Sequence, residues 1–371
     1  MTTTLLEPDA LVTEAGVLVG AAVRIRDGRV LEVGDLEPAP GEPRQRVAGT
    51  LLPGLVDLQV NGAAGHSCAD GSAEALDAVA RACWRGGAAA FLPTLVTAPF
   101  PRLLAQTRSV AEWIARAPAD AAQPLGIHLE GPFLEASGVH DASCFVDPTP
   151  ERIDALLEAA RGQLRLVTLA PARPAAAAAT ARLRAHGVTV AIGHAADPAH
   201  LAACVQAGAT LVTHLFNAMG RMHHREPGIA GLALDEPRLS ASLIVDGAHV
   251  HPAMLRNAWR CLASARTVLV TDAVAAAGMP DGEYELGGRK VRLHDGVVRD
   301  PEGRLAGSAL TMARAAMNFA RAVPDAGPWT LARIAAWNPA QLIGAREHGA
   351  IARGMRAAFC VREADGNIRP L

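Results

Sequence analysis

The chain has 371 residues, of which 50% are hydrophobic and 19% are charged, and its formal net charge is −2. This composition is typical of a globular enzyme with a large core, and the near-zero charge gives no electrostatic reason to expect nucleic acid or a membrane as a partner. The six cysteines have no CxxC spacing and the N-terminus lacks an export signal, so we expect reduced thiols and a cytoplasmic protein.

Both ends of the chain have the alternating pattern of β-strands. Residues 16–35 read "GVLVGAAVRIRDGRVLEVGD", two alternating runs around an Asp-Gly turn, and residues 356–370 read "RAAFCVREADGNIRP", with a second Asp-Gly turn. Such turns between alternating runs are the strongest short hairpin signal. We therefore predict one small β-sandwich domain assembled from residues 1–52 and 349–371, which flank a larger domain at 53–348.

The larger domain alternates short apolar runs with segments of helical period. One helix is predicted to begin at Pro198, with Asp197 as its N-cap. Eight strands alternating with helices predict an α/β fold, a (β/α)8 TIM-like barrel. A hairpin, "GEYELGGRKVRLHDGVVRDPEGRLAGS", is predicted after the eighth strand. The eight predicted strands are residues 54–60, 88–95, 125–130, 166–170, 188–194, 209–214, 240–245 and 267–272.

Four of these runs end in a side chain that is costly to bury alone: Glu130, His194, His214 and Asp272. In a barrel of this type the carboxyl ends of the strands meet at one mouth, so the four side chains are expected to converge there. One carboxylate and two imidazoles form a three-ligand set for Zn²⁺ or Fe²⁺. Asp272 would then serve as general base and general acid in the hydrolysis of an amide or a related bond.

Taken singly, each of these residues has a structural interpretation as a turn or helix-cap residue. Four of them at the ends of four predicted strands favour the metal site instead. The sequence lacks the GxSxG, GxGxxG and GxxxxGK[ST] motifs of other enzyme classes. Its one lysine, Lys290, falls in the predicted hairpin, which excludes a carboxylated lysine bridging two metals at a strand end.

Several longer motifs, including "HLEGPFL", "GHAAD", "THLFNAM", "HHREPG" and "LVTDAVAAAGMPDGEYELGG", resemble those of the N-acetylglucosamine-6-phosphate deacetylase family of the amidohydrolase superfamily. The resemblance runs in order from about Pro53 to Gly344. It implies that Glu130, His194 and His214 bind the metal and that Asp272 is catalytic. It also implies substrate-binding roles for His140, Asn217, Ala218, Arg225, His249, Leu305, Ala306 and Gly307.

The number of metal ions is a point on which the superfamily varies. Where many members have an HxH motif at the end of the first strand, this chain has Gln59 and Asn61. Neutral amides are weak ligands for Zn²⁺, so we expect one divalent ion per chain, Zn²⁺ as first choice and Fe²⁺ or another divalent metal as alternatives. Gln59 and Asn61 are expected to occupy the place of the second metal site or to contact the substrate.

The resemblance implies hydrolysis of the N-acetyl group of N-acetylglucosamine 6-phosphate by a homodimer, with Arg225 and His249 binding the phosphate. Two alternatives stay open at this point. One is the same reaction on the galactosamine epimer, and the other is a non-catalytic sensor of amino-sugar phosphates on the same fold. An intact general base argues against the sensor, since a binding protein has no use for one.

Overall fold

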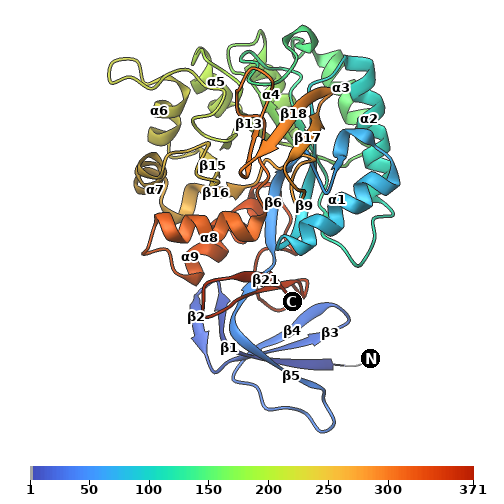
Figure 1. The fold of residues 1–371 in the computed structure, drawn as a ribbon, viewed down its shortest axis with the longest axis vertical. Helices are drawn as coiled ribbons and strands as arrows, with labels where there is room; N and C mark the ends of the chain where they lie inside the picture. The colour runs from blue at the N-terminus through green and yellow to red at the C-terminus, as the bar shows by residue number, and fades with distance from the viewer. Residues whose placement is uncertain (1–2) are drawn as a thin grey trace.

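The computed structural model describes residues 3–371, and its central sheet contains the eight parallel strands of a barrel (Figure 1). Each strand pairs in parallel with the next along the chain, which confirms the predicted (β/α)8 fold. The strands are β6 (Leu55–Val60), β9 (Ala88–Val96), β11 (Ile127–Glu130), β12 (Leu164–Leu169), β13 (Thr189–Ile192), β14 (Leu211–Val212), β15 (Ser240–Ile244) and β16 (Thr267–Val270). A short strand, β10 (Gln123–Pro124), adds to β9.

The first and eighth strands close the barrel through a few bonds near their carboxyl ends. Val60 and Ala273 form a parallel bridge, the Asp272 amide donates to the Gln59 carbonyl at 3.0 Å, and the Asn61 amide donates to the Ala273 carbonyl at 2.7 Å. The two strands meet along this line, which we call the closing seam. It passes directly beside Asp272.

Helices cover the outside of the barrel, and the strands beneath them are almost continuously buried, as expected for a parallel sheet covered on both faces. Side-chain oxygens of Ser72, Thr149 and Thr311 cap three of the helices. The helices are α1 (Ala73–Arg85), α2 (Phe100–Ile114), α3 (Pro150–Ala160), α4 (Ala176–Ala185), α5 (Leu201–Gln206), α6 (Gly228–Asp235), α7 (Pro252–Arg266), α8 (Met312–Ala322), α9 (Pro328–Ala332) and α10 (Asn338–Leu342).

The predicted start of α5 at Pro198 is wrong, because the helix begins at Leu201. Asp197 accepts a hydrogen bond from the Ala199 amide at 2.8 Å, which makes a local turn in place of a helix cap. His200 then has a left-handed φ of 63° that no helix continues through. None of the helices in residues 3–371 combines the length and the apolar character needed to cross a membrane.

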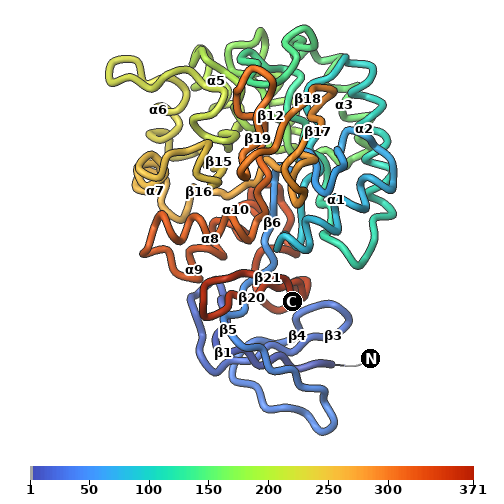
Figure 2. Tube along the Cα trace, in the orientation of Figure 1, coloured from blue at the N-terminus to red at the C-terminus, as the bar shows by residue number. Residues whose placement is uncertain are grey.

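The small β-domain is built from both ends of the chain, as predicted (Figure 2). Its seven strands are linked by hydrogen bonds into one sheet, and the C-terminal strand β20 pairs antiparallel with β5. Its core is separate from that of the barrel and includes Leu11, Val23 and Val361. The strands are β1 (Thr3–Thr13), β2 (Gly16–Val19), β3 (Ala22–Arg26), β4 (Arg29–Gly34), β5 (Arg44–Pro53), β20 (Phe359–Arg362) and β21 (Ile368–Pro370).

The domain boundaries near residues 52 and 349 stay a prediction. Ile351 packs in the core of the small domain and β5 ends at Pro53, which agree with them. In Figure 1 the small domain lies beneath the barrel and β6 leads up out of it. The carboxyl ends of the barrel strands therefore face away from the small domain.

The predicted hairpin after the eighth strand is present but has a third strand. β17 (Gly282–Leu286), β18 (Arg289–His294) and β19 (Val297–Arg299) form an antiparallel sheet. Its apolar side, with Leu286 and Val291, packs on Val274 and Ala306 beside the barrel mouth. The inserted sheet therefore covers part of the end where the four polar residues lie.

Candidate active site

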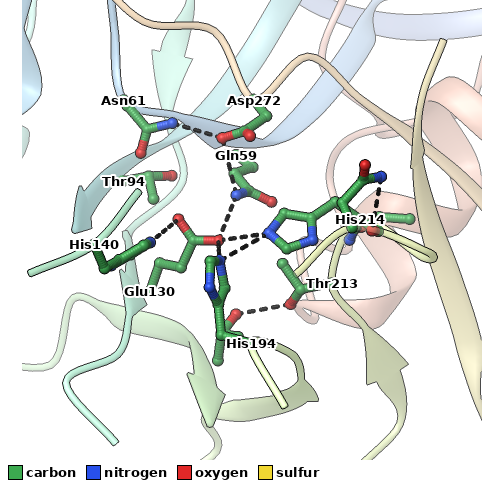
Figure 3. Close-up of polar contacts among 12 residues, drawn as sticks. Gln59, Asn61, Thr94, Glu130, His140, His194, Thr213, His214 and Asp272 are labelled. Atoms are coloured by element: carbon green, nitrogen blue, oxygen red, sulfur yellow. Dashed lines mark hydrogen bonds and ion pairs between the residues drawn. The ribbon is translucent and has the colours of Figure 1, made fainter. Parts of the chain in front are cut away.

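Four residues at the carboxyl ends of barrel strands meet at the mouth of the barrel (Figure 3). Glu130 is the last residue of β11, and His194, His214 and Asp272 each come two residues after a strand. Those three have positive φ angles of 48°, 32° and 51°. Residues other than glycine rarely adopt this conformation, because it is sterically strained. The positive φ turns each residue out of its strand toward the mouth. Backbone strain of this kind concentrates at functional sites.

Glu130, His194 and His214 form a tight cluster. Glu130 Oε1 lies 2.9 Å from His214 Nε2 and 3.2 Å from His194 Nε2, and the two Nε2 atoms are 3.1 Å apart. All three residues are at most 4% exposed. The cluster is a candidate metal site by its atoms alone, since each residue offers one ligand atom toward the others.

The hydrogen bonding of His194 supports a cation at this point. Its Nδ1 donates to the Ala136 carbonyl at 2.9 Å, so in the neutral ring Nε2 carries a lone pair. That lone pair faces a carboxylate oxygen and the Nε2 atom of His214. Such electron-rich atoms repel one another unless a proton or a metal ion lies between them. The donor set, two imidazoles and one carboxylate, suits a divalent metal.

Asp272 is held beside this cluster by two amides. Gln59 Nε2 donates to Asp272 Oδ1 at 3.0 Å and to Glu130 Oε1 at 2.9 Å, and Asn61 Nδ2 donates to Asp272 Oδ1 at 2.7 Å. Burial, together with the charge of Glu130, raises the pKa of Asp272 to about 6. A carboxylate with a pKa near neutrality can both accept and return a proton.

His140 lies on the opposite side of Glu130, with its Nε2 3.5 Å from Glu130 Oε2. Its Nδ1 lies 3.0 Å from Thr97 Oγ1, which orients the ring. Burial lowers the pKa of His140, so the ring is neutral at physiological pH. A neutral imidazole so placed can donate one hydrogen bond into the site.

A cavity of about 160 Å³ opens next to the cluster. It contains most of the residues singled out by sequence, namely Asn61, Glu130, His140, His194, His214, Asn217, Ala218, His249, Asp272, Leu305 and Gly307. Gln59 reaches the same cluster from beneath, through its bonds to Glu130 and Asp272.

Gly307 shows why the loop over the cavity needs a glycine. Its φ is +62°, and a Cβ atom there would lie 2.4 Å from Val274 Cγ1 and 2.9 Å from the Asp272 carbonyl oxygen. The loop therefore approaches Asp272 more closely than any side chain allows.

Two predicted substrate residues lie outside this cavity. Ala306 is fully buried in the small apolar cluster beneath the inserted sheet. Arg225 lies in an exposed loop, where its Nη1 is 3.0 Å from His224 Nε2. The described residues thus bring together all of the predicted catalytic and metal residues, but not the predicted phosphate-binding arginine.

Sequence reasoning misses the apolar wall of the cavity, formed by Val96, Val139, Ile244 and Leu286. Leu286 comes from the inserted sheet, and its alternation within "GEYELGG" signals only that it faces inward. It also misses Asp246, whose Oδ2 lies 2.6 Å from His249 Nδ1 and orients that ring. The Asp-Gly pair at 246–247 reads as a turn, which conceals this contact.

A closed parallel barrel whose mouth holds this cluster and a hydrogen-bonded aspartate defines a metal-dependent barrel hydrolase. Residues 50–368 match the model of the Amidohydrolase family, and the chain belongs to that family.

Similar proteins are known by both sequence and structure. N-acetylgalactosamine-6-phosphate deacetylase of Escherichia coli O157:H7 is 37% identical, over 92% of this chain and 90% of its own length. N-acetylglucosamine-6-phosphate deacetylase of Vibrio furnissii is 36% identical, over 86% and 80%. A mutant of the Mycobacterium smegmatis N-acetyl-D-glucosamine-6-phosphate deacetylase, solved in complex with N-acetyl-D-glucosamine-6-phosphate, superimposes with a TM-score of 0.93 and 33% identity, covering 99% of this chain and 97% of that one.

We expect Glu130→Gln to abolish tight metal binding and leave the fold intact. The amide of glutamine has nearly the shape of the carboxylate, but it lacks the negative charge that binds a divalent cation together with the two imidazoles. Metal analysis of the purified variant should find a small fraction of the wild-type content. Glu158→Gln on the exposed face of α3 is the control and should keep the wild-type content. Full metal content in Glu130→Gln would place the ion elsewhere.

Proposed function

We propose that this chain is a deacetylase that hydrolyses the N-acetyl group of N-acetylglucosamine 6-phosphate to glucosamine 6-phosphate and acetate. The observation that carries the proposal is the convergence of Glu130, His194 and His214 beside Asp272 in one cavity. The similarity of nearly the whole chain to deacetylases of this substrate supports it.

Glu130, His194 and His214 would hold one divalent ion, Zn²⁺ as first choice and Fe²⁺ or another divalent metal as alternatives. Zinc bonds of about 2.0–2.2 Å in a tetrahedral arrangement set ligand atoms roughly 3.3 Å apart, near the separations in this cluster. When bound, such an ion polarises the amide carbonyl and lowers the pKa of water. Gln59 and Asn61 stand where a second ion would need strong ligands, which supports one ion per chain.

Asp272 would move the proton. Its carboxylate accepts the proton of the attacking water as the new C–O bond forms. It returns that proton to the amide nitrogen as the C–N bond breaks, so that the products are acetate and an amine. Gln59 and Asn61 both donate to Oδ1, which leaves the other carboxylate oxygen free for the transfer.

The remaining cavity residues would bind the sugar. His140, Asn217, Ala218, Leu305 and Gly307 line the space beside the reacting atoms. His249 faces the same cavity with its Nδ1 donating to Asp246, and it would contact the phosphate through Nε2.

Arg225 would be the second phosphate-binding residue, and it would act across a homodimer interface. Its loop is exposed, and no carboxylate lies within 4.0 Å of its guanidinium among the described residues. A guanidinium without a carboxylate partner suits a phosphate dianion because it can donate two parallel hydrogen bonds. The six cysteines of the described chain are all unpaired, which supports a reducing, cytoplasmic setting.

The galactosamine epimer is the second candidate substrate. It is favoured by the 37% identity to the Escherichia coli enzyme that is named for that epimer. The two sugars differ in the orientation of one hydroxyl group, so the same cluster would serve either.

Acetate release from both epimers, with and without a chelator, tests the proposal. We expect turnover of N-acetylglucosamine 6-phosphate that chelation abolishes and added Zn²⁺ restores, because hydrolysis depends on the ion in the cluster. A higher kcat/KM for the galactosamine epimer would make that epimer the preferred substrate. Binding of both sugars with no acetate release would favour the sensor and contradict the deacetylase.

Asp272→Asn is the sharpest test of the proton transfer. Asparagine keeps an oxygen that can accept from Gln59 and Asn61, so the fold and metal content should not change. Turnover should fall by roughly 10²–10⁴, the loss expected when a general acid and base is removed. Steady-state kinetics measures the turnover, and metal analysis of the same sample measures the metal content. Near-normal turnover would remove Asp272 from the mechanism.

Arg225→Ala tests the phosphate contact. We expect kcat/KM for the phosphorylated sugar to fall and the poor activity on N-acetylglucosamine to stay unchanged, because only the first substrate carries the anion. Arg221→Ala in the same exposed loop is the matched control and should change neither value. An equal loss on both substrates would make Arg225 structural.

A further inference from the structure

Asp57 is a fully buried carboxylate that has no part in the chemistry above. It lies in the middle of β6 and is 1% exposed. Among the described residues no basic side chain lies within 4.0 Å of it, although an isolated buried carboxylate is costly. Burial raises its pKa to about 7. Three hydrogen bonds offset the cost.

These hydrogen bonds span the closing seam. Oδ1 accepts from the Gln59 amide on its own strand at 3.2 Å and from the Thr271 amide at 3.2 Å. Oδ2 accepts from the Thr271 hydroxyl at 2.6 Å. Thr271 follows β16, so one carboxylate ties the first strand of the barrel to the end of the eighth.

A register shift lets Asp57 lie behind the site while Gln59 lies in it. Asp57 pairs with Phe91 and Val60 pairs with Pro93, so β6 has one residue more than β9 over this stretch. Asp57 consequently lines a small cavity on the outer side of the barrel, with Cys83 of α1 and Met312 of α8. Gln59, two residues further on, donates to both Glu130 and Asp272 inside the barrel (Figure 3).

Thr271 connects this outer contact to the backbone of Asp272. Its hydroxyl donates to Asp57 and accepts from the Ala273 amide at 3.1 Å, so it bridges the residues on both sides of Asp272. Asp272 itself has a φ of 51° and donates its amide to the Gln59 carbonyl. A strained residue keeps such a conformation only where its surroundings determine it. Those surroundings include Thr271 and Gln59, the two residues that Asp57 holds, and Ser308, whose amide donates to the Asp272 carbonyl at 2.8 Å.

We propose that Asp57 is a positioning residue for this site: through Thr271 and Gln59 it fixes the backbone of Asp272 and the amide group that orients its carboxylate. The inference rests on the proposed role of Asp272 as general base and acid. Asp57 does not touch the substrate or the reacting atoms. Its contribution is to kcat, because a small displacement of a proton-transfer group slows the chemical step more than it weakens substrate binding.

A double-mutant cycle separates positioning from a general loss of stability. Thr271→Val removes the hydroxyl that donates a hydrogen bond to Asp57. The substitution is made in the wild-type chain and in the Asp272→Asn chain, and both proteins are loaded with metal. In the wild-type background we expect kcat to fall by about 10- to 100-fold with KM nearly unchanged. In the Asp272→Asn background we expect the residual turnover to change little. Thr271→Ser, which keeps the hydroxyl, should restore most of the loss.

Two further variants complete the design. Asp57→Asn keeps an acceptor for the two amides but not for the hydroxyl, and it should lower kcat as Thr271→Val does. Thr180→Val is the matched control, because Thr180 is also fully buried and its hydroxyl donates within α4 to the Ala176 carbonyl at 2.8 Å. It should lower the melting temperature but not kcat.

Equal losses from Thr271→Val in both backgrounds, or wild-type kcat in Thr271→Val and Asp57→Asn, would overturn the proposal. A crystal structure of Thr271→Val supplies a readout that needs no turnover. We expect the Asp272 carboxylate to leave its hydrogen bond with Asn61. An unmoved carboxylate would overturn the positioning role, whatever the activity of the wild type. Absence of acetate release by the wild type would refute the proposed function alone, because this structural readout does not depend on turnover.

Discussion

The site depends on one electrostatic constraint, the meeting of three electron-rich atoms at the barrel mouth. Glu130 Oε1 and the Nε2 atoms of His194 and His214 lie about as close as hydrogen-bonded atoms do, yet the bond from His194 Nδ1 to a carbonyl leaves a lone pair facing the cluster. A proton or a metal ion between these atoms makes the arrangement favourable in a buried place. The surrounding residues hold the three atoms and Asp272 in that geometry.

The barrel supplies the rigidity that such a cluster needs. The three residues of the cluster come from three different strands, so each is fixed by a separate set of backbone bonds. Glu130 ends β11, and His194 and His214 follow β13 and β14 by sharp left-handed turns. Few backbone bonds join β6 to β16 at the closing seam. The buried carboxylate of Asp57 reinforces the seam at the point where Asp272 leaves it.

The barrel is predictable from sequence because strands buried on both faces are continuous apolar runs, and four of the eight runs end in a polar side chain that marks the mouth. The strand ends are less predictable. β13 ends at Ile192 and not at the predicted His194, because the left-handed turn at His194 depends on neighbouring strands. Asp57 escapes notice for a similar reason, since the register shift that places it outside the barrel arises only from pairing with β9. Arg225 is identified by motif resemblance, but the single chain does not place it against the cavity.

Metal stoichiometry measured together with activity tests the central claim most directly, that one ion at Glu130, His194 and His214 suffices for hydrolysis. Metal-free protein would be titrated with Zn²⁺ while bound metal and acetate release are followed in the same samples. The account predicts that activity rises in proportion to bound metal and reaches its maximum at one equivalent per chain, because Gln59 and Asn61 offer a second ion only neutral amides. Activity that follows a second tightly bound equivalent, or that persists in metal-free protein, would contradict it.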